Sequence, residues 1–223
     1  MKKNHFIAMV CMVALCACTK EAKFNPENAT LYAGDSIQVT VENAGATPKL
    51  VSEDVFVASV SETGWLKARH VGETTVRCDY DASSTTAELA QCKVTVQPRY
   101  EYYTEPISDW TTTRAQLIEQ LGEPSIDNGE MLAFGNPNKD DFIYLYYLAE
   151  GKIIQSNIVH KSLTVDEAEA FLSERYAAME DDPTLYMDAD DEDGATKYVY
   201  VQQGTMNPMG MVVMVTYSMA GEE

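Results

Sequence analysis

The sequence predicts a two-domain protein in which an all-β sandwich is followed by an α+β domain. Short runs of alternating polar and apolar residues fill the chain from residue 31 to residue 97, with no helical period between them. Two apolar stripes with helical spacing then follow, among strands joined by hairpins. Because the pattern of polar and apolar residues changes near residue 98, we place the two domains at 26–97 and 98–223.

The first seventeen residues are typical of a secretory signal. Lys2 and Lys3 give a positive start, and the apolar run over 6–17 is shorter than the ~20 residues of a membrane-spanning helix. The segment Leu15-Cys16-Ala17-Cys18 resembles the lipobox of bacterial lipoproteins. This resemblance implies cleavage before Cys18, a diacylglycerol on its sulfur and an acylated amine. The alternative is a plain signal peptide with a chance cysteine.

The mature chain is therefore expected to sit in the cell envelope, on the outer membrane, held through the acyl chains on Cys18. A polar segment over 18–25 reads as a lipidated tether. Several acyl chains give durable anchoring where a single chain gives only marginal binding. The formal net charge of −19 repels nucleic acid and anionic lipid heads, so we expect no nucleic-acid partner.

Five segments of the first domain alternate as β-strands do, and we expect them to pair antiparallel. They are 36–41, 55–60, 65–68, 74–78 and 91–96. Ordered blocks within this region resemble bacterial immunoglobulin-like domains of group 2. The blocks are Ala33-Gly34-Asp35-Ser36, Val57 to Val60 before Gly64, His70 to Val76, and Cys92 to Val96.

The resemblance covers about 26–97 and implies an immunoglobulin-like sandwich that acts as a spacer or adhesion module. The sequence departs from the family where tryptophan is usual before Ser52, because Leu50 and Val51 stand there. We therefore expect the core to be filled differently at that point.

Cys78 and Cys92 form a candidate disulfide. Each lies on the inward face of a predicted strand, and a hairpin centred near Thr85 places them opposite each other. Such a bond is worth about 3 kcal/mol in the chain-entropy model. Two buried thiols that pack as small apolar residues are an equal alternative.

Aromatic residues crowd the join between the domains. They are Tyr100, Tyr102, Tyr103 and Trp110. Aromatic side chains on an exposed loop can stack on sugars or on a partner protein, which makes these four residues candidates for partner binding. Packing at the domain interface is the favoured interpretation, because aromatic residues are usually buried.

The second domain is predicted to have two helices on one face of an antiparallel sheet. Thr112 is expected to cap the first helix, which Gly122 ends. Thr164 and Glu167 form a capping box for the second, whose apolar stripe extends to Met179. Strands are expected at 131–134, 142–148, 153–159, 185–188, 197–202 and 211–217.

The run from Trp110 to Pro124 is similar to small domains of the β-lactamase-inhibitor-protein-like and outer-membrane-assembly lipoprotein type. This short resemblance implies protein–protein contact.

An acidic run before Gly194 raises the question of a calcium site. The candidate ligands are Asp188, Asp190, Asp191 and Asp193. In a helix–loop–helix calcium loop with Gly194 at the sixth position, Ala189 falls first and Tyr200 twelfth, so the pattern fails. A solvated turn is the favoured interpretation, and we predict no metal or other cofactor.

No catalytic motif is evident, so we predict no catalytic residue. The sequence has no Gly-x-Ser-x-Gly, His-Glu-x-x-His or phosphate-binding glycine loop. The predicted function is a non-catalytic, lipid-anchored envelope protein whose immunoglobulin-like spacer presents a C-terminal domain that binds a protein or a glycan. The alternative is an extracytoplasmic hydrolase that uses carboxylates of the C-terminal domain.

Overall fold

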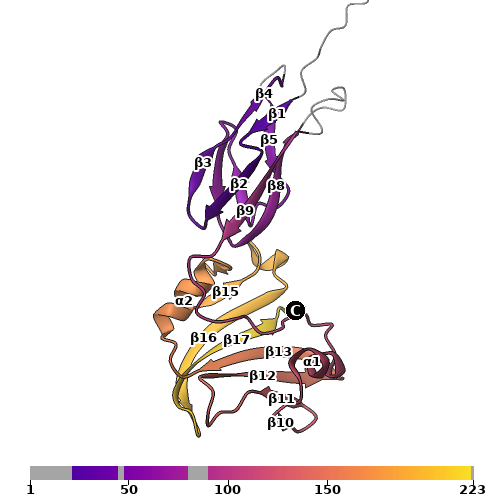
Figure 1. Cartoon of the computed structure of the whole chain (residues 1–223), viewed down its shortest axis with the longest axis vertical. Helices are drawn as coiled ribbons and strands as arrows, with labels where there is room; N and C mark the ends of the chain where they lie inside the picture. Colours follow the sequence, from indigo (N-terminus) through magenta and orange to yellow (C-terminus); the bar gives the residue numbers. More distant parts are fainter. Residues whose placement is uncertain (1–21, 45–47, 80–89, 222–223) are drawn as a thin grey trace, which may run out of the picture.

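The computed structural model describes residues 22–44, 48–79 and 90–221. Within them the chain is rich in β-structure and has two α-helices, which confirms the coarse fold class (Figure 1). We call residues 22–97 the N-terminal part and residues 98–221 the C-terminal part. Cys18 lies outside the described residues. None of the described helices is long and apolar enough to cross a membrane.

Nine strands make up the N-terminal part. They are β1 (Lys23–Asn25), β2 (Asn28–Tyr32), β3 (Ser36–Gln38), β4 (Thr40–Glu42), β5 (Lys49–Ser52), β6 (Ala58–Val60), β7 (Trp65–Ala68), β8 (Gly72–Asp79) and β9 (Gln91–Gln97). They form a four-stranded sheet in the order β2-β9-β8-β5, a three-stranded sheet in the order β3-β7-β6, and the pair β1-β4.

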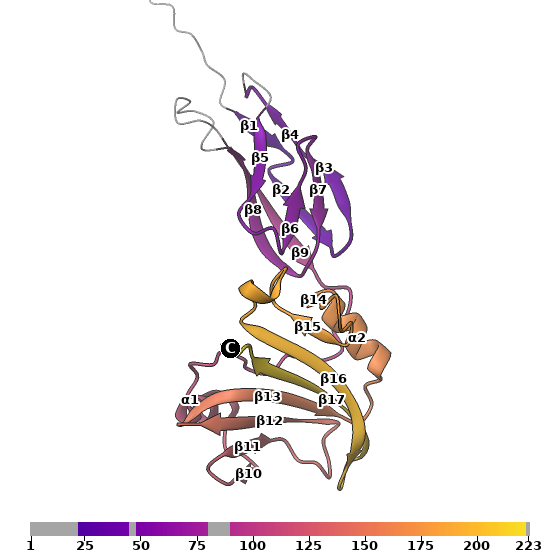
Figure 2. The same ribbon diagram turned by 180° about the vertical axis from the view of Figure 1, so that it is seen from behind.

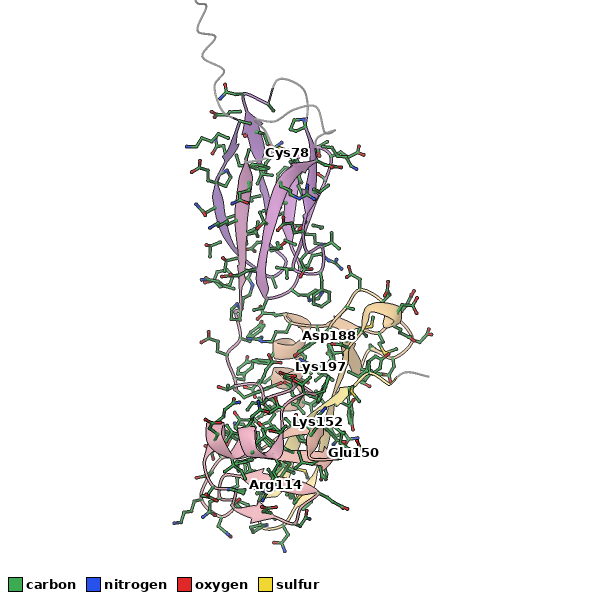
Figure 3. All side chains as sticks on the ribbon, turned by 90° about the vertical axis from the view of Figure 1, so that its right-hand side faces the viewer. Cys78, Arg114, Glu150, Lys152, Asp188 and Lys197 are labelled. Atoms are coloured by element: carbon green, nitrogen blue, oxygen red, sulfur yellow. The ribbon has the colours of Figure 1, made fainter. Side chains whose placement is uncertain are left out.

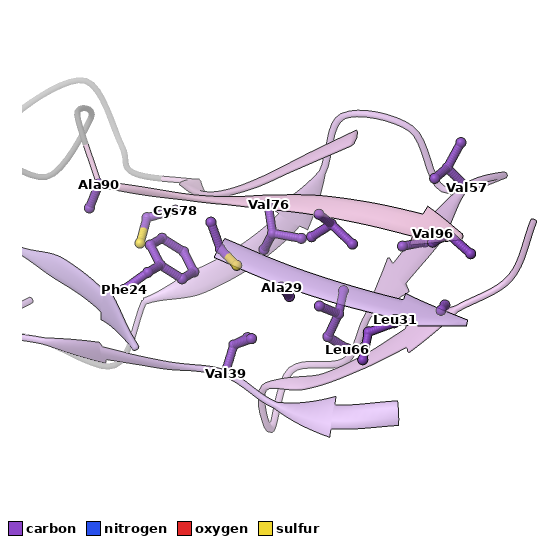
Figure 4. Packing of buried hydrophobic residues seen from close by; sticks show 14 residues of the cluster. Phe24, Ala29, Leu31, Val39, Val57, Leu66, Val76, Cys78, Ala90 and Val96 are labelled. Atoms are coloured by element: carbon purple, nitrogen blue, oxygen red, sulfur yellow. The ribbon is translucent and has the colours of Figure 1, made fainter. Parts of the chain in front are cut away.

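A single hydrophobic core joins these sheets (Figure 4). Strand β9 shows how the sequence builds it, because Cys92, Val94 and Val96 are buried while their neighbours face outward. Successive side chains of a strand point to opposite faces, so this alternation commits one face to the core. Leu66 of β7 and Val39 complete the core from the other side.

Three details of the N-terminal part differ from the prediction. Strand β2 pairs with β9 in parallel, so the part is not wholly antiparallel. The predicted strand over 36–41 is divided at Val39, because β3 pairs with β7 whereas β4 pairs with β1. Phe24 of β1 is buried in the core, so the folded region begins within the predicted tether over 18–25.

Cys78 and Cys92 are not joined by a disulfide. The predicted hairpin register was wrong by two residues, because Cys92 pairs with Val76. Cys78 therefore lies diagonally from Cys92, and diagonal neighbours in a sheet are separated by about 7–8 Å, too far for a disulfide without movement of the backbone. Both side chains pack in the core, as the alternative interpretation expected.

The C-terminal part is built on an eight-stranded sheet. Its strands are β10 (Ile126–Asp127), β11 (Met131–Phe134), β12 (Phe142–Ala149), β13 (Lys152–His160), β14 (Ala177–Ala178), β15 (Leu185–Met187), β16 (Lys197–Met206) and β17 (Gly210–Met219). The order is β10-β11-β12-β13-β17-β16-β15-β14, and every neighbouring pair is antiparallel. A short 3-10 helix covers Glu192–Gly194.

The two helices are α1 (Arg114–Leu121) and α2 (Val165–Ser173). Thr164 and Glu167 form the predicted capping box of α2. The cap of α1 is Thr113 rather than Thr112, because Gln116 stands three residues later and completes a capping box. Helix α2 ends at Ser173, so the predicted stripe to Met179 was too long, and Ala177–Ala178 forms β14 instead.

Both helices cover the same face of the sheet, which we call the helical face. Leu117 of α1 packs with Leu132 and Tyr146, and Phe171 of α2 packs with Ile158 and Tyr217. The opposite face carries a cluster that contains strand and hairpin residues but none from either helix. Figure 2 shows this second face without a helix over it, and we call it the uncovered face.

Candidate functional site on the uncovered face of the C-terminal sheet

The join between the two parts runs across the helical face, between α1 and α2 (Figure 1). Sheet side chains hold its backbone: the Tyr144 hydroxyl donates to the Thr104 carbonyl at 3.0 Å, and the Ser156 hydroxyl donates to the Ile107 carbonyl at 2.6 Å. The Tyr146 hydroxyl accepts from the Ile107 amide at 3.1 Å, and burial raises the pKa of Tyr146 to about 12. The join is therefore part of the packed structure.

The four candidate aromatic residues of the join divide into two pairs. Tyr103 stacks on Phe171 with ring centroids 4.1 Å apart, and Trp110 packs against both clusters of the helical face. Tyr100 and Tyr102 are exposed and stack on each other at 5.5 Å. The structure thus packs the partly buried Tyr103 and Trp110 against the helical face and leaves Tyr100 and Tyr102 at the surface.

Glu174 connects the N-terminal part to the C-terminal part. Its side chain is only 7% exposed, and its Oε2 atom accepts from the backbone amides of Arg99 at 2.8 Å and Tyr100 at 3.1 Å. Its backbone carbonyl accepts from the Val71 amide of the N-terminal part at 2.7 Å. Arg99 extends the connection, because its guanidinium pairs with Asp35 at 2.7 Å. These contacts hold one end of the N-terminal part against α2.

The acidic run supplies internal contacts. Asp188 Oδ1 accepts from the amides of Thr196 and Lys197, and Figure 3 shows Asp188 and Lys197 side by side. Asp190 makes a bidentate pair with Arg69 of the N-terminal part, at 2.6 and 2.9 Å, and this pairing lowers the pKa of Asp190.

Asp191 caps the 3-10 helix through the Gly194 amide, while Asp193 lies exposed within that helix. Within residues 22–44, 48–79 and 90–221, no group of three or more His, Cys, Asp or Glu side chains is arranged to hold a metal ion. The turn interpretation thus accounts for the positions of three of the four candidate calcium ligands.

The uncovered face presents a row of side chains that belong to four different strands. The row is set by the strand register, in which Tyr147 pairs with Gln155, Gln155 with Ser218, and Ser218 with Tyr198. Paired residues of antiparallel strands point to the same side of a sheet. Tyr147 is 38% exposed, and Gln155, Ser218 and Tyr198 are half-buried. The row is therefore an accessible strip with two phenol rings and two smaller polar groups.

A buried polar network supports this strip from the next row. The Asn157 Oδ1 atom accepts from the Thr216 hydroxyl at 2.7 Å and from the Gln155 amide group at 3.1 Å, and the Asn157 amide group donates to the Leu145 carbonyl at 3.4 Å. Asn157 and Thr216 are fully buried. Satisfied buried networks fix side-chain positions, so the Gln155 side chain is held in place at the surface.

One end of the uncovered face is closed by the β16–β17 hairpin. Met209 of the hairpin packs with Ile143 and Val159, and Met206 lies against the same cluster. The hairpin thus covers the apolar residues around Ile143 and Val159, whereas Ile126 of β10, which pairs with Ala133 of the same cluster, is 48% exposed. The tyrosine and amide strip also stays accessible, and it has the composition typical of contact surfaces.

Sequence reasoning did not find this surface. Tyr147 was assigned to a strand, but nothing in the local pattern joins it to Gln155 or Tyr198, because the three residues meet only through strand order. One sequence feature could have drawn attention to this strand: the predicted strand 142–148 has aromatic or apolar residues on both of its faces. In the structure Tyr144 and Tyr146 of this strand pack under the helices, and Tyr147 is the aromatic residue that it presents on the uncovered face.

Comparison with known proteins does not assign the chain to a family. No protein-family model matches it, and no curated protein does. A crystal structure of a cysteine-rich secretory protein from Staphylococcus aureus subsp. aureus Mu50 is similar over 52% of this chain, with 12% identity and a TM-score of 0.29. The match spans about half, 47%, of that structure's chain. A similarity this low does not establish a shared fold.

Proposed function

We propose that the protein is a non-catalytic, lipid-anchored protein of the bacterial cell envelope that binds a partner through its C-terminal part. Cleavage after residue 17 and acylation of Cys18 would tether it to the outer membrane, as the charged start, short apolar run and lipobox-like ending suggest. A Cys18→Ala chain should then leave the membrane fraction and stay folded. Retention of that variant in the membrane fraction would contradict the anchor.

The N-terminal part serves in this proposal as an immunoglobulin-like spacer. Its resemblance to group 2 bacterial domains supports this role, as does the packing of its sheets around one core. The Glu174 and Arg99 contacts give the spacer a fixed attachment to the C-terminal part. A spacer with a fixed attachment holds the binding surface at a set distance and orientation from its tether.

The observation that carries the proposal is the tyrosine and amide strip on the uncovered face. Tyrosine offers a large contact area with little loss of side-chain freedom, together with a hydroxyl that can hydrogen-bond. Tyr147 lies beside the Gln155 side chain that the Asn157 network holds in place, and Tyr198 ends the row beyond Ser218. A protein or a glycan can use such a strip, and the resemblance of 110–124 to protein-binding domains supports a protein. The carboxylate-dependent hydrolase stays an untested prediction.

A comparison of two aromatic variants tests this surface. The tagged protein, Tyr147→Ala and Trp65→Ala are used as baits with envelope extract and on a glycan array. Trp65 is the matched control, because it is an exposed aromatic residue of the N-terminal part. A ligand retained by the unaltered protein and Trp65→Ala but lost by Tyr147→Ala supports the proposal. Equal retention by all three baits would place the contact elsewhere.

A further inference from the structure

A second surface feature lies on the helical face, at the far end of α1. It is a hollow of about 540 Å³ where three elements end: Leu121 closes α1, Phe134 closes β11 and Phe142 opens β12. Tyr144 contributes to the same wall, and Asp140 and Asp141 come from the loop between β11 and β12. The hollow is thus lined by aromatic and aliphatic side chains together with two carboxylates.

The aromatic wall is exposed yet held in position. Phe142 is 40% exposed and Leu121 is 36% exposed. The Phe142 ring stacks on His160 with centroids 5.7 Å apart and meets Tyr144 edge-on at 5.4 Å. His160 is itself fixed, because its Nδ1 atom accepts from the amides of Ser162 and Leu163, each at 3.1 Å. A ring clamped between two neighbours offers a preformed face to a ligand.

The two carboxylates differ in how they are used. Asp140 Oδ2 accepts from the Asn136 amide at 2.6 Å, which orders the loop. Asp141 is exposed, and among the described residues its carboxylate has no hydrogen bond or ion pair. Lys161 stands nearby, but its ammonium donates to the Asp140 backbone carbonyl at 2.7 Å. The side chains that line the hollow therefore carry two negative charges and no positive charge.

The geometry points to an organic cation as the occupant. We propose that this hollow receives an arginine side chain presented by a partner protein. A planar guanidinium can stack on the Phe142 ring while its N–H groups bond the Asp141 and Asp140 carboxylates. The net charge of −19 draws basic surfaces toward the protein at long range. The proposal is independent of the uncovered face, because the hollow opens on the other side of the sheet.

The expected strength for a single side chain is low. A cation over an exposed ring and an exposed ion pair are each weak contacts, because water screens both. One arginine therefore binds weakly, with a dissociation constant of roughly tens to hundreds of millimolar, and the remaining affinity of a protein partner comes from its other contacts. A weak site of this kind is measured best by NMR.

The test is a titration of the isotopically labelled protein with acetyl-arginine amide at low ionic strength. The expected result is a set of amide shifts confined to residues 119–123, 133–144 and 160–163. Acetyl-citrulline amide has the same shape without the charge, so it should bind about tenfold more weakly. N-acetylglucosamine, titrated in parallel, examines a sugar as the occupant. Shifts at the hollow as large with the sugar or with citrulline as with arginine, at equal concentration, would overturn the proposal.

Two variants with matched controls complete the test. Asp141→Asn should weaken arginine binding severalfold, whereas Asp181→Asn, at another exposed aspartate, should leave it unchanged. Phe142→Ala should abolish the shifts, whereas Ile154→Ala, at a similarly exposed apolar residue, should preserve them. Asp141→Asn removes no described hydrogen bond or ion pair, only the electrostatic effect of Asp141 on His160, so it decides the question even if Phe142→Ala unfolds. Equal affinity of the Asp141 and Asp181 variants would mean that arginine binds the acidic surface at large.

Discussion

Replacement of Glu174 by alanine should lower the stability of the protein, and it should weaken the connection between its two parts because Arg99, which pairs with Asp35 of the N-terminal part, is no longer held. The carboxylate is buried and accepts two backbone amides, those of Arg99 and Tyr100. An N–H group left without an acceptor in a buried site costs about 1–3 kcal/mol. Because these amides are only partly buried, we expect water to recover some of that loss, and the net effect should be about 2–4 kcal/mol.

The measurement is urea unfolding followed by circular dichroism and by tryptophan fluorescence, to which Trp65 of the N-terminal part and Trp110 of the C-terminal part contribute. Glu180→Ala is the matched control, because it removes the same charge from an exposed position shortly after α2. We expect the Glu174 variant to unfold at lower urea and in two steps, since its two parts are less firmly joined. If the two variants unfold within about 0.5 kcal/mol of each other, Glu174 does not join the parts in the way its contacts indicate.

Three further predictions concern single sites. Burial lowers the pKa of His160, so the folded protein binds this proton less readily than the unfolded chain; the corresponding stability is present above about pH 6.5 and lost as the pH falls. His160→Asn, which keeps an acceptor but cannot titrate, should therefore lose less stability between pH 7 and pH 5 in urea unfolding, and an equal loss would contradict this assignment. Cys78 and Cys92 should both react with iodoacetamide after unfolding without reductant and neither before it, as read by peptide mass spectrometry; a linked pair would refute the reported register. Glu150 has a positive φ of 51° in the β12–β13 turn, so Glu150→Asn should raise the free energy of unfolding by about 0.5 kcal/mol, and a decrease would speak against a left-handed turn there.

Local signals in the sequence predicted the helices and most strands of the C-terminal part. The capping box of Thr164 and Glu167 marks the start of α2 because both partners lie within four residues. The turn at Glu150 and Gly151 has a local signal too, because Gly151 lies between the predicted strands 142–148 and 153–159. The end of α2 could not be predicted in this way. Tyr176 continues the apolar pattern and is buried in the same cluster as α2, but it lies beyond the last residue of the helix. An apolar pattern shows which residues are buried, but it does not show whether those residues belong to a helix, a strand or a loop.

Long-range pairing was the part that sequence reasoning could not supply. The offset between Cys78 and Cys92 depends on the hairpin between β8 and β9, whose length the alternation does not fix. Phe24 gave no signal either, because β1 has only three residues and no period can be read from them. The strip that contains Tyr147 and the hollow beside Phe142 depend on strand order and on where elements end, so both became visible only in three dimensions.

The parallel pairing of β2 with β9 has a mechanical consequence. Five residue pairs join these strands, from Asn28 with Lys93 to Tyr32 with Gln97, and β9 leads directly into the join. A pull between the N-terminal end of the chain and the C-terminal part would draw the two strands past each other, so their hydrogen bonds share the load and must yield together. Single-molecule stretching should then show one high-force rupture for the N-terminal part, whereas a low-force, stepwise opening would contradict it. If the protein is anchored at its N-terminal end and bound to a partner through its C-terminal part, the β2–β9 pair would resist extension of the chain.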